Sequence, residues 1–419
     1  MDSHSNLDWG IVAVFVTVYL GMFLGGLPRL KLDRSGVALL GAIAVMGLGV
    51  MSTEQAARSV DLPTILLLFS FMVVSAQLRL GGFYRALTLR VAALPLERRG
   101  LLAALIVVAA ILSAVFSNDV VCLAMTPVVA RLCLQRRWNP VPFLIGLACA
   151  ANIGSAATLI GNPQNMLIGE TLRLSFAGYA LEAAVPVLAG LAVTWAVIAL
   201  LSRGRWTLAG GAAAVPEAER READDAVFDP WQTAKGLLVA GALLAVFLFT
   251  SLPREVAALT GAGLLLLSRR LHSNKMLGLV DWELLVLFIG LFVVNHAFQA
   301  TGLAAQVMAW LDAAGLALAA PMTLFVATFV ASNLVSNVPA VMLLLPAATE
   351  PWSGPLLALV STLAGNFLIV GSIANIIVVD CAARRGIRID WRAHARIGVP
   401  VTLATLAIAA AWLLLRIGR

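Results

Sequence analysis

The sequence is short of charge. Only 12% of its 419 residues are Asp, Glu, Lys or Arg, whereas soluble domains carry roughly 25%. Hydrophobic residues make up 61% of the chain, and the mean hydropathy is +0.95. A soluble fold could not bury this much apolar surface, so lipid must surround most of the chain.

The sequence also lacks the residues of common catalytic sites. It has four histidines and four cysteines, and their spacing suggests neither a zinc site nor a disulfide framework. No His-Glu-x-x-His, Gly-x-Ser-x-Gly or Gly-x-x-x-x-Gly-Lys-Ser/Thr motif occurs, which argues against an intramembrane enzyme and against a primary pump. We expect no cofactor, although a separate ATPase partner stays open.

What the sequence does contain is a series of long apolar runs. None shows the roughly ten-residue alternation of a membrane barrel, so an all-α polytopic membrane protein is predicted. Two runs, 101–134 and 318–348, are too long for one span and are interrupted by polar residues near their centres. Each fits a re-entrant hairpin of two half-length helices. The prediction is therefore about ten transmembrane helices plus two re-entrant hairpins, with further discontinuous helices at 140–170 and 355–380.

The placement of basic residues supports this topology. With both termini outside and both hairpins re-entrant, 24 of the 29 Lys and Arg fall in cytoplasmic loops, as the positive-inside rule requires. Arginines stand singly or in pairs between apolar runs, so the net charge of +7 reflects membrane orientation and not nucleic-acid binding. We expect a multi-pass protein of a bacterial cytoplasmic (inner) membrane.

The two halves of the chain resemble each other. Val60-Asp61 and Val280-Asp281 open two spans, and Gly82 and Gly302 follow at the same offset of 220. The predicted orientations oppose each other, which is typical of the inverted repeats of secondary transporters. The prediction assigns residues 1–202 to a first inverted repeat, 203–230 to a polar cytoplasmic linker and 231–419 to a second inverted repeat.

Four polar breaks interrupt the apolar runs in symmetric pairs, at the two hairpin tips and in the two discontinuous spans. Irregular backbone at membrane depth is tolerated where it is buried or lines a cavity, and broken helices direct their N-terminal amides at one point. Single Ser or Asn residues often only join helices, but four matched breaks favour a site for a small-ion substrate. The candidate substrate and ion ligands are Ser117, Asn118, Asp119, Gly161, Asn162, Gln164, Asn165, Ser336, Asn337, Gly371, Ser372 and Asn375.

Asp119 is the one acid at a hairpin tip, and the matching position of the second half is Val338. An acid at membrane depth is costly and usually functional, so we expect Asp119 to be the coupling residue that carries H⁺ or Na⁺. The alternative is a capping carboxylate for the second hairpin arm. Asp61 and Asp281 are expected to cap helices, whereas Glu170 and Asp380 end spans, where solvation at the interface explains them.

The motifs SNDVVCLAMTP, NIGSAATLIGNPQNMLIG, SNLVSNVPAVMLLLP and LAGNFLIVGSIANIIV resemble those of the ion transporter superfamily, most closely its arsenite/antimonite permease branch and neighbouring anion permeases. The resemblance covers nearly the whole chain. It implies a scaffold domain, a transport domain that carries both hairpins, elevator-type movement and a homodimer. It also places Ser, Asn and Gly residues of the four breaks around the solute and ion.

The chain departs from the sodium-coupled dicarboxylate branch, whose tips carry Ser-Asn-Thr, because its own tips read Ser-Asn-Asp and Ser-Asn-Val. The leading hypothesis is a proton-coupled secondary transporter of a small anion or oxyanion, arsenite-like acids included. Sodium/proton antiport and sodium-coupled anion symport, with Na⁺ at the hairpin tips, are the alternatives, and a channel is a further one. Cys122, beside the first tip, is a weak candidate contact for a thiophilic solute.

Overall fold

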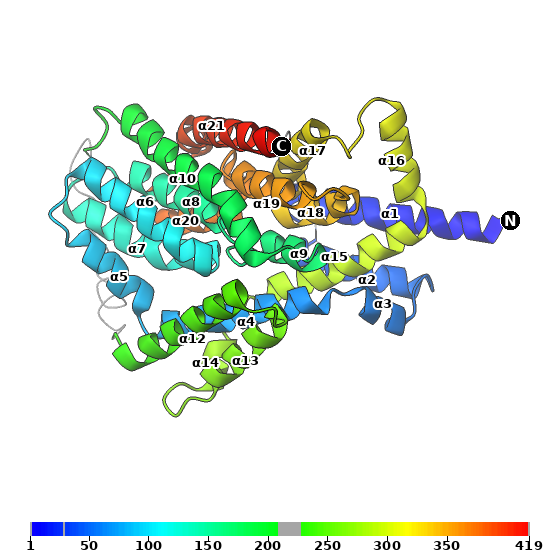
Figure 1. Cartoon of the computed structure of the whole chain (residues 1–419), viewed down its shortest axis with the longest axis horizontal. Helices are drawn as coiled ribbons and strands as arrows, with labels where there is room; N and C mark the ends of the chain where they lie inside the picture. The colour runs from blue at the N-terminus through cyan, green and yellow to red at the C-terminus, as the bar shows by residue number, and fades with distance from the viewer. Residues whose placement is uncertain (1, 28–29, 208–227, 418–419) are drawn as a thin grey trace.

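The computed structural model describes residues 2–27, 30–207 and 228–417, with side chains from residue 9 onward. Most of the predicted linker, 208–227, lies outside the described residues. Within them the chain forms helices and no β-strand, and one isolated bridge joins Trp138 to Thr207. The fold is therefore the expected all-α one (Figure 1).

The helices follow the same order in both halves. The first half contains α1 (Asp2–Leu24), α2 (Arg34–Gly47), α3 (Thr53–Ser59), α4 (Leu62–Leu80), α5 (Phe83–Ala92), α6 (Arg98–Val115), α7 (Asn118–Gln135), α8 (Pro140–Ser155), α9 (Pro163–Thr171) and α10 (Phe176–Leu201). The second contains α12 (Pro230–Phe249), α13 (Arg254–Leu266), α14 (Ser273–Leu277), α15 (Trp282–Ala300), α16 (Leu303–Ala313), α17 (Pro321–Val335), α18 (Asn337–Leu344), α19 (Ser353–Ala364), α20 (Ile373–Ala383) and α21 (Trp391–Ile417).

Local signals repeat with the helices. Asp61 and Asp281 cap α4 and α15 by accepting the backbone N–H three residues on, as expected. Gly82 and Gly302 begin α5 and α16 with φ of 72° and 73°, a left-handed conformation that glycine adopts without a Cβ penalty. The chain therefore makes the same turn at the end of α4 and of α15.

The equivalent helices α4 and α15 pack against each other. The start of α4, at Asp61, lines a pocket together with His296 and Gln299 near the end of α15. Farther along α4, Phe69 lies near Trp282, the first residue of α15, with ring centroids 6.1 Å apart. The two equivalent helices thus run in opposite directions.

Both long runs are broken into two helices that contact each other, but α6 and α7 have 18 residues each and are longer than the half-length helices that we expected. In the first hairpin, α6 and α7 lie side by side and are joined through Phe116 and Ser117. In the second, Ser336 alone joins α17 to α18. Ser332 and Asn333, which we expected to belong to the break, remain inside α17.

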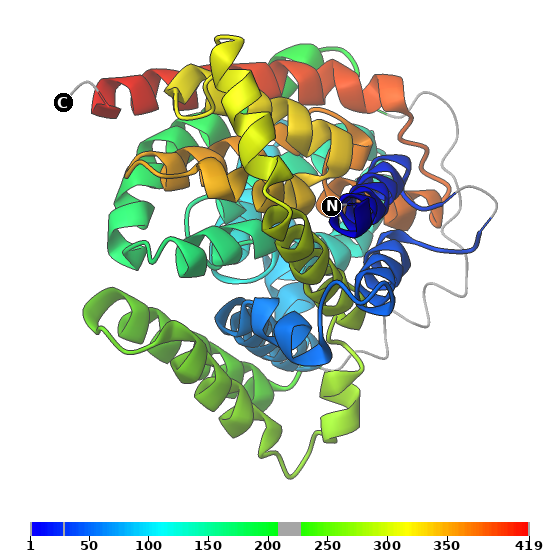
Figure 2. The same cartoon turned by 90° about the vertical axis from the view of Figure 1, so that its right-hand side faces the viewer.

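Helices from one half pack on helices from the other. The most extensive contacts between the halves join α2 to α15 and α13 to α4. In Figures 1 and 2, α12, α13 and α14 form a group beside α4, apart from the group of hairpins and broken spans. Each half therefore completes the packing of the other.

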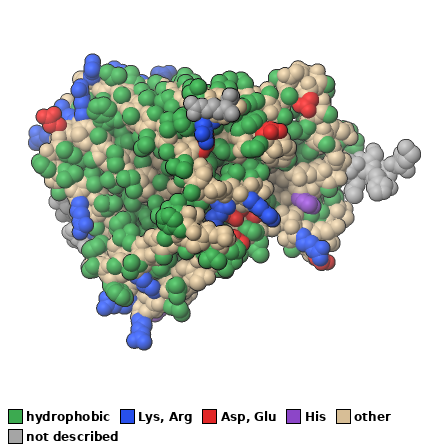
Figure 3. Space-filling view, viewed as in Figure 1, with side chains coloured by type: hydrophobic (Ala, Val, Ile, Leu, Met, Phe, Trp, Pro, Cys, Tyr) green, Lys and Arg blue, Asp and Glu red, His purple; other side chains and the backbone are tan. Residues whose placement is uncertain are grey.

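The described residues contain six helices that are long and apolar enough to cross a membrane, and further apolar helices are shorter. Hydrophobic side chains cover most of the face in Figure 3, and charged ones are few. The exposed apolar residues include Leu181, Phe249 and Leu267, each 75–83% exposed. A surface of this kind fits lipid and not water.

Candidate functional site

The two discontinuous spans unwind at their centres. Residues 156–162 separate α8 from α9, and residues 365–372 separate α19 from α20. Pro163 follows the first break and has no N–H to lose at the helix start, while Asn162 accepts the N–H of Asn165 at 2.9 Å. In the second break Ser372 accepts the N–H of Ala374 at 3.2 Å.

Asn152, near the end of α8, is the centre of one cluster of hydrogen bonds. Its Oδ1 accepts from Asn118 Nδ2 at 3.0 Å and from Ser372 Oγ at 2.9 Å. Its Nδ2 donates to Asn366 Oδ1 at 2.9 Å and to Asn375 Oδ1 at 3.2 Å. One carboxamide thus connects the first hairpin tip to the second broken span.

Thr362, on α19, is the centre of a second cluster. Its Oγ1 accepts from Asn162 Nδ2 and from Gln164 Nε2, each at 3.2 Å, and lies 3.4 Å from Asn165 Oδ1. Asn165 also contacts the Tyr179 hydroxyl at 3.2 Å. This cluster connects the second half to the first broken span.

The two clusters are related by the repeat. Thr362 lies 210 residues after Asn152, and the same offset relates Ser372 to Asn162 and Asn375 to Asn165. Asn152 binds the Ser and Asn of the second break, and Thr362 binds the matching residues of the first. Each half therefore holds the break of the other.

Side chains also satisfy backbone groups that the breaks release. Asn375 Nδ2 donates to the carbonyls of Gly365 at 2.7 Å and Leu368 at 3.0 Å. Asn165 Nδ2 donates to the carbonyl of Thr158 at 3.1 Å. These bonds explain how irregular backbone persists at membrane depth.

The matching glycines differ in how closely they pack. A Cβ on Gly161 would overlap the Ser155 carbonyl oxygen and lie 2.8 Å from that of Ser113. A Cβ on Gly371 would lie 3.2 Å from the Gly365 carbonyl oxygen. The first break thus requires glycine, because backbone atoms approach it closely. The first hairpin tip also contacts Gly161, since the Asn118 N–H donates to the Gly161 carbonyl with an N···O distance of 3.4 Å.

Several buried polar atoms at the tips have no hydrogen-bond partner. They include the side-chain oxygens of Asn118 and Asn337, the equivalent asparagines of the two hairpins, and Asn333 Oδ1 beside the second tip. An unpaired buried acceptor costs about 1–3 kcal/mol, so unpaired groups of this kind need an explanation. Amide oxygens are ligands that hard cations prefer.

Asp119 lies in the first turn of α7, beyond the hydrogen-bonded clusters. Among the described residues, no hydrogen bond or ion pair engages its carboxylate. The residue is partly exposed. The alternative of a capping carboxylate gains no support, because the N-cap position of α7 is Ser117.

The structure thus brings most of the predicted residues together. Asn118, Gly161, Asn162, Gln164, Asn165, Ser372 and Asn375 take part in the hydrogen-bonded clusters or meet them directly. The other five, Ser117, Asp119, Ser336, Asn337 and Gly371, lie at the tips and at the edge of the second break. Cys122 is fully buried, so its thiol is closed to solute in this state.

Sequence reasoning missed the residues at the centres of the clusters. Thr362 has no glycine or proline beside it, whereas Asn366 directly follows Gly365 and Asn152 lies two residues before Gly154. The repeat offset of 210 would have pointed to Asn152 and Thr362, because both are polar at the same place. Gly365 marks Asn366 in the sequence, a signal that the prediction did not use.

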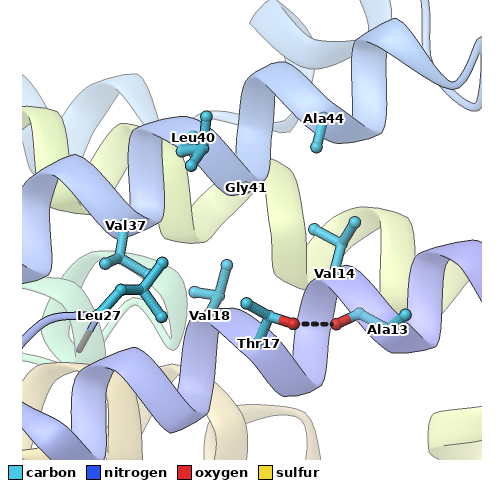
Figure 4. A pocket seen from close by; sticks show the side chains of 9 residues that line it. All are labelled: Ala13, Val14, Thr17, Val18, Leu27, Val37, Leu40, Gly41 and Ala44. Carbon is cyan, nitrogen blue, oxygen red and sulfur yellow. Dashed lines mark hydrogen bonds between the residues drawn. The ribbon is translucent and has the colours of Figure 1, made fainter. Parts of the chain in front are cut away.

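Other pockets have different characters. A cavity of about 420 Å³ between α15 and the ends of α9 and α18 is lined by Asp61, Asn295, His296 and Gln299, among others. The pocket in Figure 4, between α1 and α2, is apolar. Its one hydroxyl, on Thr17, already donates to the Ala13 carbonyl at 2.7 Å, so it lacks the groups of a solute site.

Comparison with known proteins agrees with this architecture. Residues 20–364 match the family model described as citrate transporter. A silicon efflux transporter of Oryza sativa subsp. japonica is 31% identical over 97% of this chain and 98% of its own length. The protein arsB of Dictyostelium discoideum is 22% identical over 91% of this chain and 87% of its own.

A solved structure shares the fold. The YdaH transporter of Alcanivorax borkumensis aligns over 100% of this chain and 98% of its own, with a TM-score of 0.51 and 15% identity. The expected resemblance to the ion transporter superfamily and its anion permeases is thereby confirmed. The chain is a multi-pass membrane protein and belongs to the citrate transporter family.

Proposed function

We propose that this protein is a secondary active transporter that moves a small anion or oxyanion across the cytoplasmic membrane. In this proposal the hairpins and broken spans form a transport domain that moves as an elevator against a scaffold. The supporting observation is the paired clusters around Asn152 and Thr362, which hold three of the four broken elements, the first tip and both broken spans. Ser155 links the clusters, because its hydroxyl accepts from Asn162 Nδ2 and donates to the Asn152 carbonyl. Repeats 1–202 and 231–419 supply the two opposite states.

The solute class follows from the groups present. The predicted site and the two clusters contain amides, hydroxyls and one acid, and no Lys or Arg. Helices α7, α9, α18 and α20 begin at the breaks, and their N-terminal amides carry partial positive charge. Such a site suits a small or weakly charged oxyacid better than a polyanion. Arsenite and silicic acid are therefore the first solutes to test, and citrate, which the family model names, is the polyanion to compare with them.

Coupling to protons is assigned to Asp119. Asp119 is a partly exposed residue, has no hydrogen-bond or ion-pair partner among the described residues and lies at the tip of a hairpin, where it can gain and lose a proton as the hairpin moves. Sodium coupling is the second candidate, because the unpaired Asn118 and Asn337 side-chain oxygens provide matched ligands for a hard cation.

The test uses proteoliposomes that contain the wild type or Asp119→Asn. We expect a pH gradient to drive accumulation of one of the three solutes by the wild type. The variant's rate of pH-driven accumulation should be about tenfold or more below that of the wild type. It should still exchange solute across the membrane without a gradient. Asp312→Asn, at an exposed acid on α16, is the matched control and should behave like the wild type.

Each other outcome has a clear meaning. If a pH gradient still drives uptake in Asp119→Asn, Asp119 is not the coupling residue. Accumulation that follows a sodium gradient would favour sodium coupling at the tips. Proton flux that requires sodium but no solute would favour a sodium/proton antiporter. We further propose that the protein forms a homodimer. A separate ATPase partner is a second, independent proposal.

A further inference from the structure

One ion pair that is mostly shielded from solvent joins the two groups of helices. Arg254, the first residue of α13, places its Nε 3.1 Å from Glu170 Oε1 near the end of α9. The two side chains are only 16% and 11% exposed. Arg254 Nη2 also donates to the carbonyls of Gly169 at 3.2 Å and Leu174 at 3.1 Å. Glu170 is therefore not a solvated acid at the interface, as the sequence suggested, but part of a contact between halves.

The repeat supplies an arginine and an acid a second time, with aspartate in place of glutamate. Arg34, 220 residues before Arg254, is the first residue of α2, just as Arg254 is the first residue of α13. Asp380, 210 residues after Glu170, lies near the end of α20. These are the offsets that relate the other matched features of the two halves.

The second pair is not closed in this structure. Arg34 Nε donates to the Met22 carbonyl of its own half at 3.2 Å. Asp380 pairs with Arg384 at 2.7 Å, four residues on, and the two side chains are 56% and 74% exposed. The acid and the base of the second pair thus each have a local substitute partner.

This asymmetry indicates what the opposite state contains. In inverted-repeat transporters the two halves exchange conformations when the protein changes from one access state to the other. The second pair would then adopt the closed arrangement of the first. Arg34 would leave the Met22 carbonyl and meet Asp380, while Arg254 and Glu170 would separate.

We propose that Glu170–Arg254 and Asp380–Arg34 are alternating latches, one closed in each access state. This inference rests on the proposed function only in assuming that the protein alternates between two states. The four residues are positioning residues, and none touches the solute. Forming one buried pair offsets the cost of opening the other, so the two access states stay close in free energy.

The first experiment tests whether Arg34 and Asp380 meet. The double variant Arg34→Cys/Asp380→Cys in membranes is treated with a short bismaleimide crosslinker, and peptide mass mapping identifies the link. We expect a link between positions 34 and 380. The single variant Arg34→Cys is the control for a link to native Cys381. Absence of the 34–380 link under all conditions, in protein that is folded and labelled at both positions, would overturn the proposal.

The second experiment tests whether one latch controls the other. Neutralising the closed pair with Glu170→Gln/Arg254→Gln leaves no unpaired buried charge, so folding should be retained. The rate of 34–380 linking should then rise about fivefold or more. Glu54→Gln/Arg58→Gln removes an exposed ion pair within α3 and should leave the rate unchanged. An unchanged rate in the first variant would contradict alternating latches, whatever the solute proves to be.

Discussion

Asn152 and Thr362 show how single polar side chains can join two halves of a membrane protein. Each stands inside an otherwise apolar helix, and each hydrogen-bonds to residues some two hundred positions away. Hydrogen bonds between membrane helices stabilise by only about 0.6 kcal/mol each on average. They matter here because there are several of them and because they join each half to the broken span of the other. They thereby hold the breaks that form the predicted site in place.

Replacing Asn152 with alanine removes four side-chain hydrogen bonds at once. At the average value per bond, Asn152→Ala should lower the free energy of unfolding by about 2–3 kcal/mol. Unfolding in mixed detergent micelles measures this. Thr194→Val is the matched control, because Thr194 is buried but bonds only within its own helix, and it should cost less than about 1 kcal/mol. Equal losses in the two variants would contradict a special role for Asn152.

The two matched glycines predict unequal tolerance of a methyl group. Gly161→Ala meets backbone atoms that cannot move aside, whereas Gly371→Ala meets contacts of 3.2 Å and longer. We expect Gly161→Ala to abolish the yield of folded protein and Gly371→Ala to lower thermal stability only slightly. Size-exclusion profiles and melting curves compare the two. Gly263→Ala, with no atom within 4 Å of its Cβ, should be stabilising by about 0.5–1 kcal/mol.

At the scale of elements, the two hairpins turn in different ways. The first uses Phe116 and Ser117 in ordinary extended conformations. The second turns at Ser336 alone, with φ 77° and ψ 160°, a region that is essentially restricted to glycine. A strained serine at the tip of a predicted binding hairpin suggests that its hydroxyl is needed there.

Ser336→Gly should therefore relieve strain while removing the hydroxyl. Strain of this kind costs about 1–3 kcal/mol, so we expect a net gain in stability of about 1 kcal/mol together with a raised KM for the solute. Ser117→Gly, at an ordinary φ of −55°, should instead destabilise by about 0.5–1 kcal/mol. Melting temperature and initial transport rates, measured on the same preparations, test both. A less stable Ser336→Gly would show that the turn is unstrained.

At the scale of the whole molecule, the predicted orientation in the membrane rests on the placement of Lys and Arg residues and on the opposed directions of the two predicted repeats. An alkaline phosphatase domain is active only outside the cytoplasm, so fusions report which side a segment faces. A fusion after Ile417 should be active and one after Leu277 inactive, because we predict an outside C-terminus and a cytoplasmic loop at α14. The reverse pattern would invert the predicted orientation without changing the fold.

Much of the fold could be predicted from the sequence, because helix breaks in a membrane require special residues. Both hairpins, both broken spans and the caps at Asp61 and Asp281 were marked by Ser, Asn, Gly, Pro or Asp in apolar surroundings. The centres of the site were not, because Asn152 and Asn366 lie in regular or lightly marked stretches. Their role depends on which helices meet, and so does the burial of Glu170 against Arg254, which local patterns do not encode.

The crossed packing of α2 on α15 and of α13 on α4 also has a consequence for biosynthesis. A ribosome adds about 5–20 residues per second. The completed first half must therefore wait in the bilayer for about 5–20 seconds before α13 and α15 emerge to cover α4 and α2. The partners of its polar asparagines lie on α19 and in the second break and emerge later still, which makes the nascent first half a natural substrate for membrane quality control. The same arrangement predicts that two separately translated halves could find each other and assemble.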